Sequence, residues 1–371
     1  MSKRPCTLDA FFAPPPAKKQ HIDPSPSEDG KPTTNPPLAL PEAEQQPQST
    51  HPTYPFPIPH LPHSLTSPLP STPTTSPIVM NTHPDLDILY YKPYLPLTTA
   101  KTLFHHLRHS LPFYRVKYSI KRGALDTSVT TPRFTTVFGL DSSAIFCPQS
   151  GRLLDARTPG KTLAPGSYRC RPRPIPSCLA SLLAHTERTT GANFNFALVN
   201  YYADGNDSIA FHSDSESFLG PNPTIASFTL GSPRDFLLKH KPTPSNHPSE
   251  TKAMKLPLAS GDLLLMQGRT QSHWLHSIPK RKGGVGADGA GRINITFRRA
   301  LTRAGTENYY RYNVGDGGGG GEEAYKWDDA RRAMVPWKRS GGREVEALRD
   351  GVEHCGVVPD AGRATGVELR V

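Results

Sequence analysis

The chain has 371 residues, 41 prolines, a net charge of +11 and a pI near 9.4. It contains no apolar run long enough to cross a bilayer and no signal peptide, so a membrane-spanning or secreted protein is not expected. The basic balance favours a polyanionic partner, most simply nucleic acid, although a basic but inert surface is the alternative. The five cysteines form no CxxC pair and are typical of reduced intracellular thiols.

The composition divides the chain into one globular part and two tails. About half of the 41 prolines fall in the first 80 residues, which hold few large apolar side chains. Such a segment buries too little surface to offset its ordering entropy, so we expect residues 1–84 to be a disordered, Pro-rich tail. Residues 85–312 have a globular pattern. Residues 313–371 contain a glycine run near their start and are expected to be a mostly flexible tail, apart from Tyr325, Trp327 and Trp337, which could pack back on the core.

Within the globular part, two amphipathic helices are interleaved with short strands. Leu103, Leu107 and Leu111 recur at helical spacing in the first helix, and Gly191 would end the second. The expected helices are 98–111 and 178–190, and the expected strands are 113–120, 131–138, 194–202, 224–230, 235–239, 262–267 and 292–298. This pattern predicts a mainly β fold with flanking helices, namely a double-stranded β-helix (jelly roll) with a helical layer on one side.

Two histidines and an aspartate form the most informative motif. His212-Ser213-Asp214 is followed by His276, and two imidazoles with one carboxylate can bind one face of a non-haem iron. The same His-x-Asp pattern at His21 and His83 lies in or beside proline-rich sequence that cannot hold ligands rigidly. His273 competes with His276 for the third ligand position, and chemistry alone does not choose between them.

The expected strand 292–298 places its polar residues on one face, because side chains alternate along a strand. That face consists of Arg292, Asn294, Thr296 and Arg298, whereas Ile293, Ile295 and Phe297 would fill the core between the sheets. Two cations facing a cavity are costly unless an anion meets them, and a dicarboxylate suits paired guanidiniums. A solvated strand face is the alternative. Asn200 and Tyr202, on one side of their own strand, could complete a co-substrate pocket.

At this point the chain resembles the AlkB family of nucleic-acid dealkylating dioxygenases. The similarity covers roughly residues 85–300 and looks closest to the nuclear eukaryotic homologues that repair DNA, in a fungal-looking version. The segments that carry it are 194–216, 225–231, 234–236, 273–279 and 292–298.

The resemblance implies an Fe(II)- and 2-oxoglutarate-dependent enzyme that uses O2. It implies His212, Asp214 and His276 as catalytic iron ligands. It also implies a set of residues that hold 2-oxoglutarate: Asn200, Tyr202, Arg292, Thr296 and Arg298. The implied reaction is oxidative dealkylation of bases such as 1-methyladenine and 3-methylcytosine in duplex or single-stranded DNA, which repairs the base directly. We expect a nuclear monomer.

The substrate contacts follow the family's pattern less closely. Arg133 lies in the segment that matches the nucleotide-recognition region, and Glu216 matches an acidic residue that contacts the base. Tyr168 is the candidate to stack on the flipped base, and Tyr118 is the candidate for the finger that probes the base stack. Ser215 replaces an acidic residue that touches the substrate in the relatives.

The first residues contain a short motif of their own. The segment 7–12 resembles the motif by which repair proteins dock on the sliding clamp, with Leu8, Phe11 and Phe12 as one apolar plug. The motif's usual glutamine is absent, and a chance apolar cluster is the alternative.

Other functions remain open for the globular part. An RNA demethylase or a protein hydroxylase could use the same scaffold, and a non-catalytic nucleic-acid-binding module could keep the fold. The intact ligands and both arginines favour an enzyme.

Overall fold

The computed structural model describes residues 47–66, 73, 75–122, 125–242, 252–282, 291–314 and 323–337, with the backbone alone at 117–122, 125–129, 308, 312 and 313. These residues all belong to one compact unit, residues 46–371. The predicted clamp motif at 7–12 lies outside the described residues, and so does most of the two predicted tails.

Two long helices form where the leucine spacing predicts them. Helix α2 (Leu97–Ser110) and helix α3 (Ser177–Thr190) each begin directly after a proline, and α3 ends at Gly191 in the left-handed conformation with φ of 68°. Their buried leucines pack into the main apolar cluster of the described residues. None of the described helices is both long and apolar enough to span a membrane.

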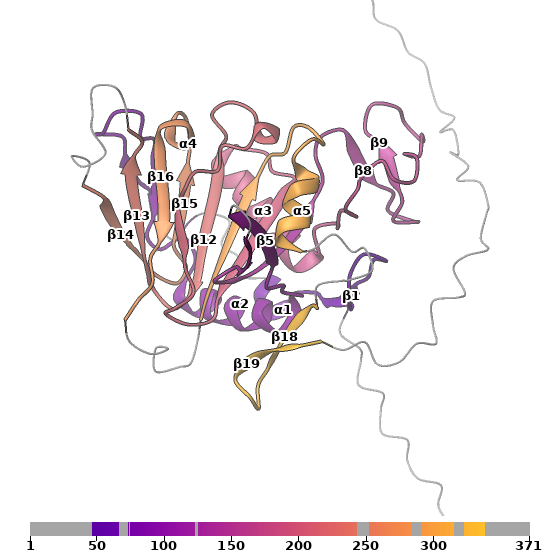
Figure 1. The fold of residues 1–371 in the computed structure, drawn as a ribbon, viewed down its shortest axis with the longest axis horizontal. Helices are drawn as coiled ribbons and strands as arrows, with labels where there is room; N and C mark the ends of the chain where they lie inside the picture. Colours follow the sequence, from indigo (N-terminus) through magenta and orange to yellow (C-terminus); the bar gives the residue numbers. More distant parts are fainter. Residues whose placement is uncertain are drawn as a thin grey trace, which may run out of the picture. The chain divides into compact units, whose positions relative to one another are not determined.

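Most of the strands lie in two antiparallel sheets, one of seven strands and one of four, as the jelly-roll prediction requires (Figure 1). The larger sheet contains, in spatial order, β3 (Ile78–Met80), β4 (Ile88–Tyr91), β15 (Leu263–Met266), β12 (Ile225–Gly231), β17 (Arg292–Arg298), β10 (Phe196–Tyr202) and β7 (Phe134–Gly139). The smaller sheet contains β11 (Ile209–His212), β16 (Trp274–Ile278), β13 (Arg234–His240) and β14 (Met254–Leu258). The mainly β fold is therefore confirmed.

Strand β17 is buried on both faces. Its apolar residues, such as Ile293 and Ile295, share a cluster with Leu103 of α2 and Leu179 of α3. The prediction that they fill the space between the sheets is therefore wrong, because the helical layer covers that face. The polar face of β17 is the one that lines the cavity described below.

Residues 47–66 differ from the prediction of a disordered tail up to residue 84. They form β1 (Gln48–Ser49), β2 (Ile58–Pro59) and α1 (His63–Thr66). Ile58, Leu61 and Leu65 are at most 8% exposed and belong to the main core cluster. A few apolar side chains are enough here, because the rest of the fold already supplies a surface on which they pack.

A hairpin after the glycine run also packs on the core. Strands β18 (Tyr325–Asp328) and β19 (Ala333–Pro336) pair with each other, and Trp327 is 9% exposed. The guanidinium of Arg108 lies 3.7 Å from the centre of the Trp327 ring, and His109 Nε2 lies 2.9 Å from a carboxylate oxygen of Asp329. This part of the predicted C-terminal tail is therefore folded.

The remaining elements are short. They are the hairpins β5 (Lys117–Arg122) with β6 (Leu125–Thr130) and β8 (Ala144–Phe146) with β9 (Leu153–Asp155), the turns η1 (Ser217–Leu219) and α4 (Thr270–His273), and helix α5 (Thr306–Asn313).

Candidate functional site

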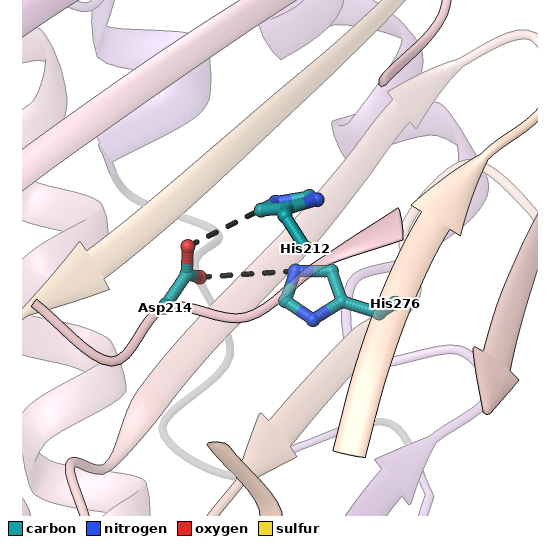
Figure 2. A group of neighbouring side chains, drawn as sticks. All are labelled: His212, Asp214 and His276. Atoms are coloured by element: carbon teal, nitrogen blue, oxygen red, sulfur yellow. Dashed lines mark ion pairs between the residues drawn. The ribbon is translucent and has the colours of Figure 1, made fainter. Parts of the chain in front are cut away.

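Three side chains, two from the smaller sheet and one from the loop after β11, converge at one point. His212 ends β11 and stands directly opposite His276 of β16 in the strand register, with 4.2 Å between the ring centres. Asp214 follows two residues after His212, and its two carboxylate oxygens each lie 3.9 Å from one imidazole Nε2 atom (Figure 2). One ligand atom from each residue lies within 4.8 Å of the others. This is the donor set that a non-haem iron site requires.

The structure also decides between the two candidate histidines. His276 is buried and turned toward Asp214. His273 ends α4, where it is only partly buried and contacts Arg269, with 2.8 Å between its Nε2 and the Arg269 Nη2. The strand β16 begins only at Trp274, so the two histidines belong to different elements and only His276 reaches the group.

Several neighbours hold the three side chains in place. The Nδ1 atom of His212 lies 2.9 Å from the carbonyl oxygen of Ala210, which leaves Nε2 directed at the shared point. The ring of Phe236 stacks on His276 at 5.3 Å. The buried Gln271 accepts a hydrogen bond of 2.9 Å from the backbone N–H of Asp214. The sequence does not mark Gln271, because its contact with Asp214 spans 57 residues.

The site stabilises the protonation states that a metal needs. Burial by itself would raise the pKa of Asp214, but Arg298, His276 and His212 outweigh burial and lower it. Burial, reinforced by His212, lowers the pKa of His276 to about 3. An ionised carboxylate and a neutral imidazole are the forms that bind metal ions.

Arg298 already has an anionic partner. Its Nη2 atom lies 3.0 Å from Asp214 Oδ2, and its Nη1 donates a hydrogen bond to the hydroxyl of Tyr309. Burial alone would lower the pKa of Arg298, but Asp214 and Tyr309 outweigh burial and raise it. The sequence predicts that both arginines of β17 bind one dicarboxylate. In the structure Arg298 already forms an ion pair with Asp214, so that prediction has to include this second role.

Arg292 has no such partner among the described residues. It is 1% exposed, and its Nη2 donates a hydrogen bond of 2.8 Å to Thr229, while Nε and Nη1 have no hydrogen-bond partner there. Burial lowers its pKa to about 10. A buried guanidinium whose N–H groups have no acceptors is energetically costly. A carboxylate of a small ligand would supply the missing acceptors for Arg292.

These groups surround one cavity of about 760 Å³ between the two sheets. Its size falls within the range of small-molecule sites, ~300–1,000 Å³. All eight predicted metal- and co-substrate-binding residues line it: Asn200, Tyr202, His212, Asp214, His276, Arg292, Thr296 and Arg298.

Two of the predicted co-substrate residues bond to the protein itself. Asn200 accepts a hydrogen bond of 3.0 Å from Arg133 Nε, and Thr296 donates one of 3.1 Å to the carbonyl oxygen of Leu198. Tyr202 lies under Arg292, with 5.4 Å from its ring centre to the guanidinium. These three residues therefore form part of the cavity wall, and Tyr202 is the one that contacts Arg292.

Only some of the predicted substrate-binding residues line the cavity. Arg133 and Glu216 line the cavity, and one carboxylate oxygen of Glu216 is buried without a hydrogen-bond partner in the described part of the chain. Ser215 is exposed, contacts Ser213 at 3.1 Å and does not line the cavity. The side chain of Tyr118, in β5, lies outside the described atoms.

The prediction for Tyr168 as the base-stacking residue does not agree with its position. Tyr168 is 8% exposed, its hydroxyl donates a hydrogen bond to Asp141, and the Arg303 guanidinium covers its ring at 4.7 Å. It lies in a separate apolar cluster with Leu140 and Ala144, outside the cavity lining. In this structure the Tyr168 ring therefore contacts Arg303 and lies outside the cavity in which a base would bind.

Other cavity residues were not singled out from the sequence. They include Phe236 and Met266, whose strand alternation could have indicated an inward position, and Tyr309 of α5, which no strand pattern marks.

Comparison with known proteins agrees with this geometry. A family model described as "2OG-Fe(II) oxygenase superfamily" matches residues 87–298. The "DNA oxidative demethylase ALKBH2" of Homo sapiens is 43% identical over 131 residues, which is 35% of this chain and 49% of that protein. The protein of the same name from Arabidopsis thaliana is 31% identical over 231 residues, or 58% of this chain and 67% of that protein.

A second group of relatives has a broader name. The "Alpha-ketoglutarate-dependent dioxygenase alkB homolog 3" of Rattus norvegicus is 40% identical over 122 residues, covering 32% of this chain and 40% of that protein. The chain thus spans about half the length of the first curated relatives it matches.

Proposed function

The chain belongs to the 2OG-Fe(II) oxygenase superfamily and, within it, to the AlkB family; from this premise we propose that it dealkylates N-alkylated bases in DNA by oxidation. The single observation that carries the proposal is the half-paired, buried Arg292 in the same cavity as the group of His212, Asp214 and His276. The two relatives named DNA oxidative demethylase support the choice of substrate.

We assign the binding roles from the contacts described above. His212, Asp214 and His276 would hold Fe(II), and the unpaired donors of Arg292 would bind a carboxylate of 2-oxoglutarate beside Tyr202. When bound, the metal and 2-oxoglutarate supply the oxidation of the N-alkyl carbon with O2.

The protein's own residues prepare that reaction. Arg298 holds the Asp214 carboxylate ionised and oriented, and Phe236 covers one face of His276 against water. A base in a duplex must be flipped out of the stack at a cost of a few kcal/mol, less for a lesion that blocks pairing. The Glu216 carboxylate in the cavity favours a substrate with positive charge, as 1-methyladenine and 3-methylcytosine carry.

The proposal also extends to partners and location. The net charge of +11 supports binding to the phosphate backbone. We propose a nuclear monomer, and sliding-clamp binding through Leu8, Phe11 and Phe12. Titration of a peptide of residues 1–20 with the clamp tests the last point, and loss of binding on Phe11→Ala with Phe12→Ala is the expected result.

The decisive experiment couples 2-oxoglutarate consumption to repair. Oligonucleotides with one 1-methyladenine or 3-methylcytosine are offered as single-stranded DNA, duplex DNA and single-stranded RNA, with Asp214→Ala as the inactive control. We expect succinate release to match loss of the methyl group from DNA. Faster repair of RNA than of both DNA forms would favour the RNA demethylase, and turnover without repair of either lesion would contradict the proposal.

A further inference from the structure

Helix α5 brings a side chain into the cavity from outside the segment that the family model matches. The match ends at residue 298, whereas α5 spans Thr306–Asn313. Tyr309 of this helix and Gly305 immediately before it both line the cavity. The helix therefore adds to the site something that family membership alone does not assign.

The helix is held firmly against the larger sheet. The hydroxyl of Tyr310 donates a hydrogen bond of 2.7 Å to the carbonyl oxygen of Gly139, at the end of β7, and accepts one of 2.9 Å from the backbone N–H of Arg173. Glu307 accepts a further bond of 2.9 Å from the backbone N–H of Arg169. These three hydrogen bonds share the docking of α5 against the end of β7 and the backbone of Arg169 and Arg173.

The chain also approaches the site closely before the helix begins. Gly305 has a φ of 100°, and a Cβ atom there would lie 2.8 Å from Cδ1 of Phe218. Only glycine combines this backbone conformation with this approach at little cost. The backbone ahead of α5 is therefore built to pack against the cavity wall.

Tyr309 contacts both the wall and the charged groups of the cavity. Its ring packs edge-on against Phe196 at 5.6 Å and Phe218 at 5.4 Å, and the Arg298 guanidinium lies 5.2 Å from the ring centre. Arg298 donates a hydrogen bond to the Tyr309 hydroxyl through Nη1 and contacts Asp214 through Nη2. Tyr309, Arg298 and Asp214 thus form one connected chain.

We propose that Tyr309 is a positioning residue of the metal centre: it orients Arg298 so that Arg298 can hold Asp214, and its ring forms the wall of the base-binding part of the cavity. The second half rests on the proposed function, whereas the first half concerns only the metal site. Helix α5 is then a necessary part of the active site.

The physical reason lies in the hydrogen bonds available to Arg298. Its Nε already lacks a partner in the described part of the chain, so loss of the Tyr309 hydroxyl would leave a second buried donor unpaired. A guanidinium in that position gains by turning toward another acceptor, which loosens Asp214. Hydrogen bonds to charged groups change an equilibrium constant by roughly tenfold or more.

The first experiment measures Mn(II) binding to the full chain without O2 or nucleic acid, by the electron paramagnetic resonance signal of free Mn(II). We expect Tyr309→Phe to weaken Mn(II) binding about tenfold. The matched control Tyr310→Phe removes a neighbouring hydroxyl that anchors α5 but does not touch Arg298, and it should keep Mn(II) binding within about twofold of the wild type.

Two outcomes overturn the positioning role. One is wild-type Mn(II) affinity in a Tyr309→Phe chain. The other is an equal loss in Tyr309→Phe and Tyr310→Phe, because both variants would then act only through the docking of α5. Circular dichroism and thermal melting of each variant identify a folding defect.

A second experiment tests whether the Tyr309 ring forms the wall of the base-binding part of the cavity. Relative to Tyr309→Phe, Tyr309→Ala should raise KM for the alkylated oligonucleotide about tenfold, because an aromatic contact with a base is worth ~1–3 kcal/mol. Equal KM values in the two variants would overturn this half. A wild-type chain that binds Mn(II) but repairs no lesion would contradict the proposed function and leave the metal-site result standing.

Discussion

The two ends of β17 carry the same residue type in different surroundings. Arg292 and Arg298 lie on one face of the strand and are at most 2% exposed. Arg298 has an acidic partner, Asp214, and a phenol, Tyr309, whereas Arg292 has one threonine and two unpaired donors in the described part of the chain. A buried charge is tolerated only when other groups compensate it. The Arg298 end of β17 is compensated within the protein and is called the complete end, whereas the Arg292 end, the incomplete end, indicates a ligand.

The largest change is expected from removal of the anion at the complete end. Asp214→Ala removes a metal-binding carboxylate and leaves Arg298 buried without its partner. We expect repair activity and Mn(II) affinity to fall at least ~100-fold. This loss should exceed that caused by changing a residue that only supports a metal ligand. The free energy of unfolding should fall by about 3–5 kcal/mol, measured in urea. Asp235→Ala, which breaks the exposed pair with Lys255, serves as the control and should cost less than ~1 kcal/mol.

The incomplete end should respond in the opposite way. Arg292→Met removes a buried charge that is only half paired, so the protein without co-substrate should gain stability, by about 1 kcal/mol or more. The KM for 2-oxoglutarate should rise about 100-fold because a paired carboxylate contact is lost. Arg292→Lys keeps the charge but lacks the paired N–H donors of a guanidinium, so its KM for 2-oxoglutarate should lie between those of the wild type and Arg292→Met. A KM equal to that of the wild type would show that Arg292 does not bind the co-substrate.

A smaller effect is expected at Gln271, which supports the complete end from the backbone side. Gln271→Leu leaves the buried N–H of Asp214 without its acceptor. We expect a loss of ~1–3 kcal/mol in stability and roughly tenfold weaker Mn(II) binding. Gln271→Glu retains an acceptor and should recover most of the metal affinity. Mn(II) affinity that is unchanged in the leucine variant would remove Gln271 from the support of the site.

The smallest effect concerns His185, a buried base that, unlike Arg292, can release its proton. It is 0% exposed, both ring nitrogens lack hydrogen-bond partners in the described part, and its ring packs against Tyr94 at 5.3 Å. Burial lowers its pKa, with nearby Arg188 acting in the same direction. The folded state therefore resists protonation, while the unfolded state takes up a proton below pH ~6.5.

Stability from a neutral His185 is thus fully present above pH ~6.5 and is lost as the pH falls below that value. We expect a loss of about 1 kcal/mol between pH 7.5 and pH 5.5 from this residue. Urea unfolding of His185→Leu at both pH values checks it, and the variant should show that much less pH dependence. An identical pH dependence in wild type and variant would assign the acid sensitivity to other groups.

Much of the site could be predicted because its clues are local in sequence. The alternation of β17 placed Arg292, Asn294, Thr296 and Arg298 on one face, and the spacing of His212 and Asp214 suited a metal. The position of Tyr168, which the family resemblance suggested as a base-stacking residue, has no local clue, because its contacts with Asp141 and Arg303 join other parts of the chain.

The sequence by itself determined the residue types of the metal centre, the face of β17 that carries the guanidiniums, and the helices α2 and α3, because these depend on periods of two and 3.6 residues. The tertiary structure placed His276, the ligand that the family resemblance implied, beside Asp214. Only the tertiary structure decided that Arg298 and not Arg292 holds Asp214, and that Tyr309 enters the cavity. The physical reason is that these contacts join segments far apart in the chain. Which of them meet is set by strand register and helix packing, and neither leaves a local pattern.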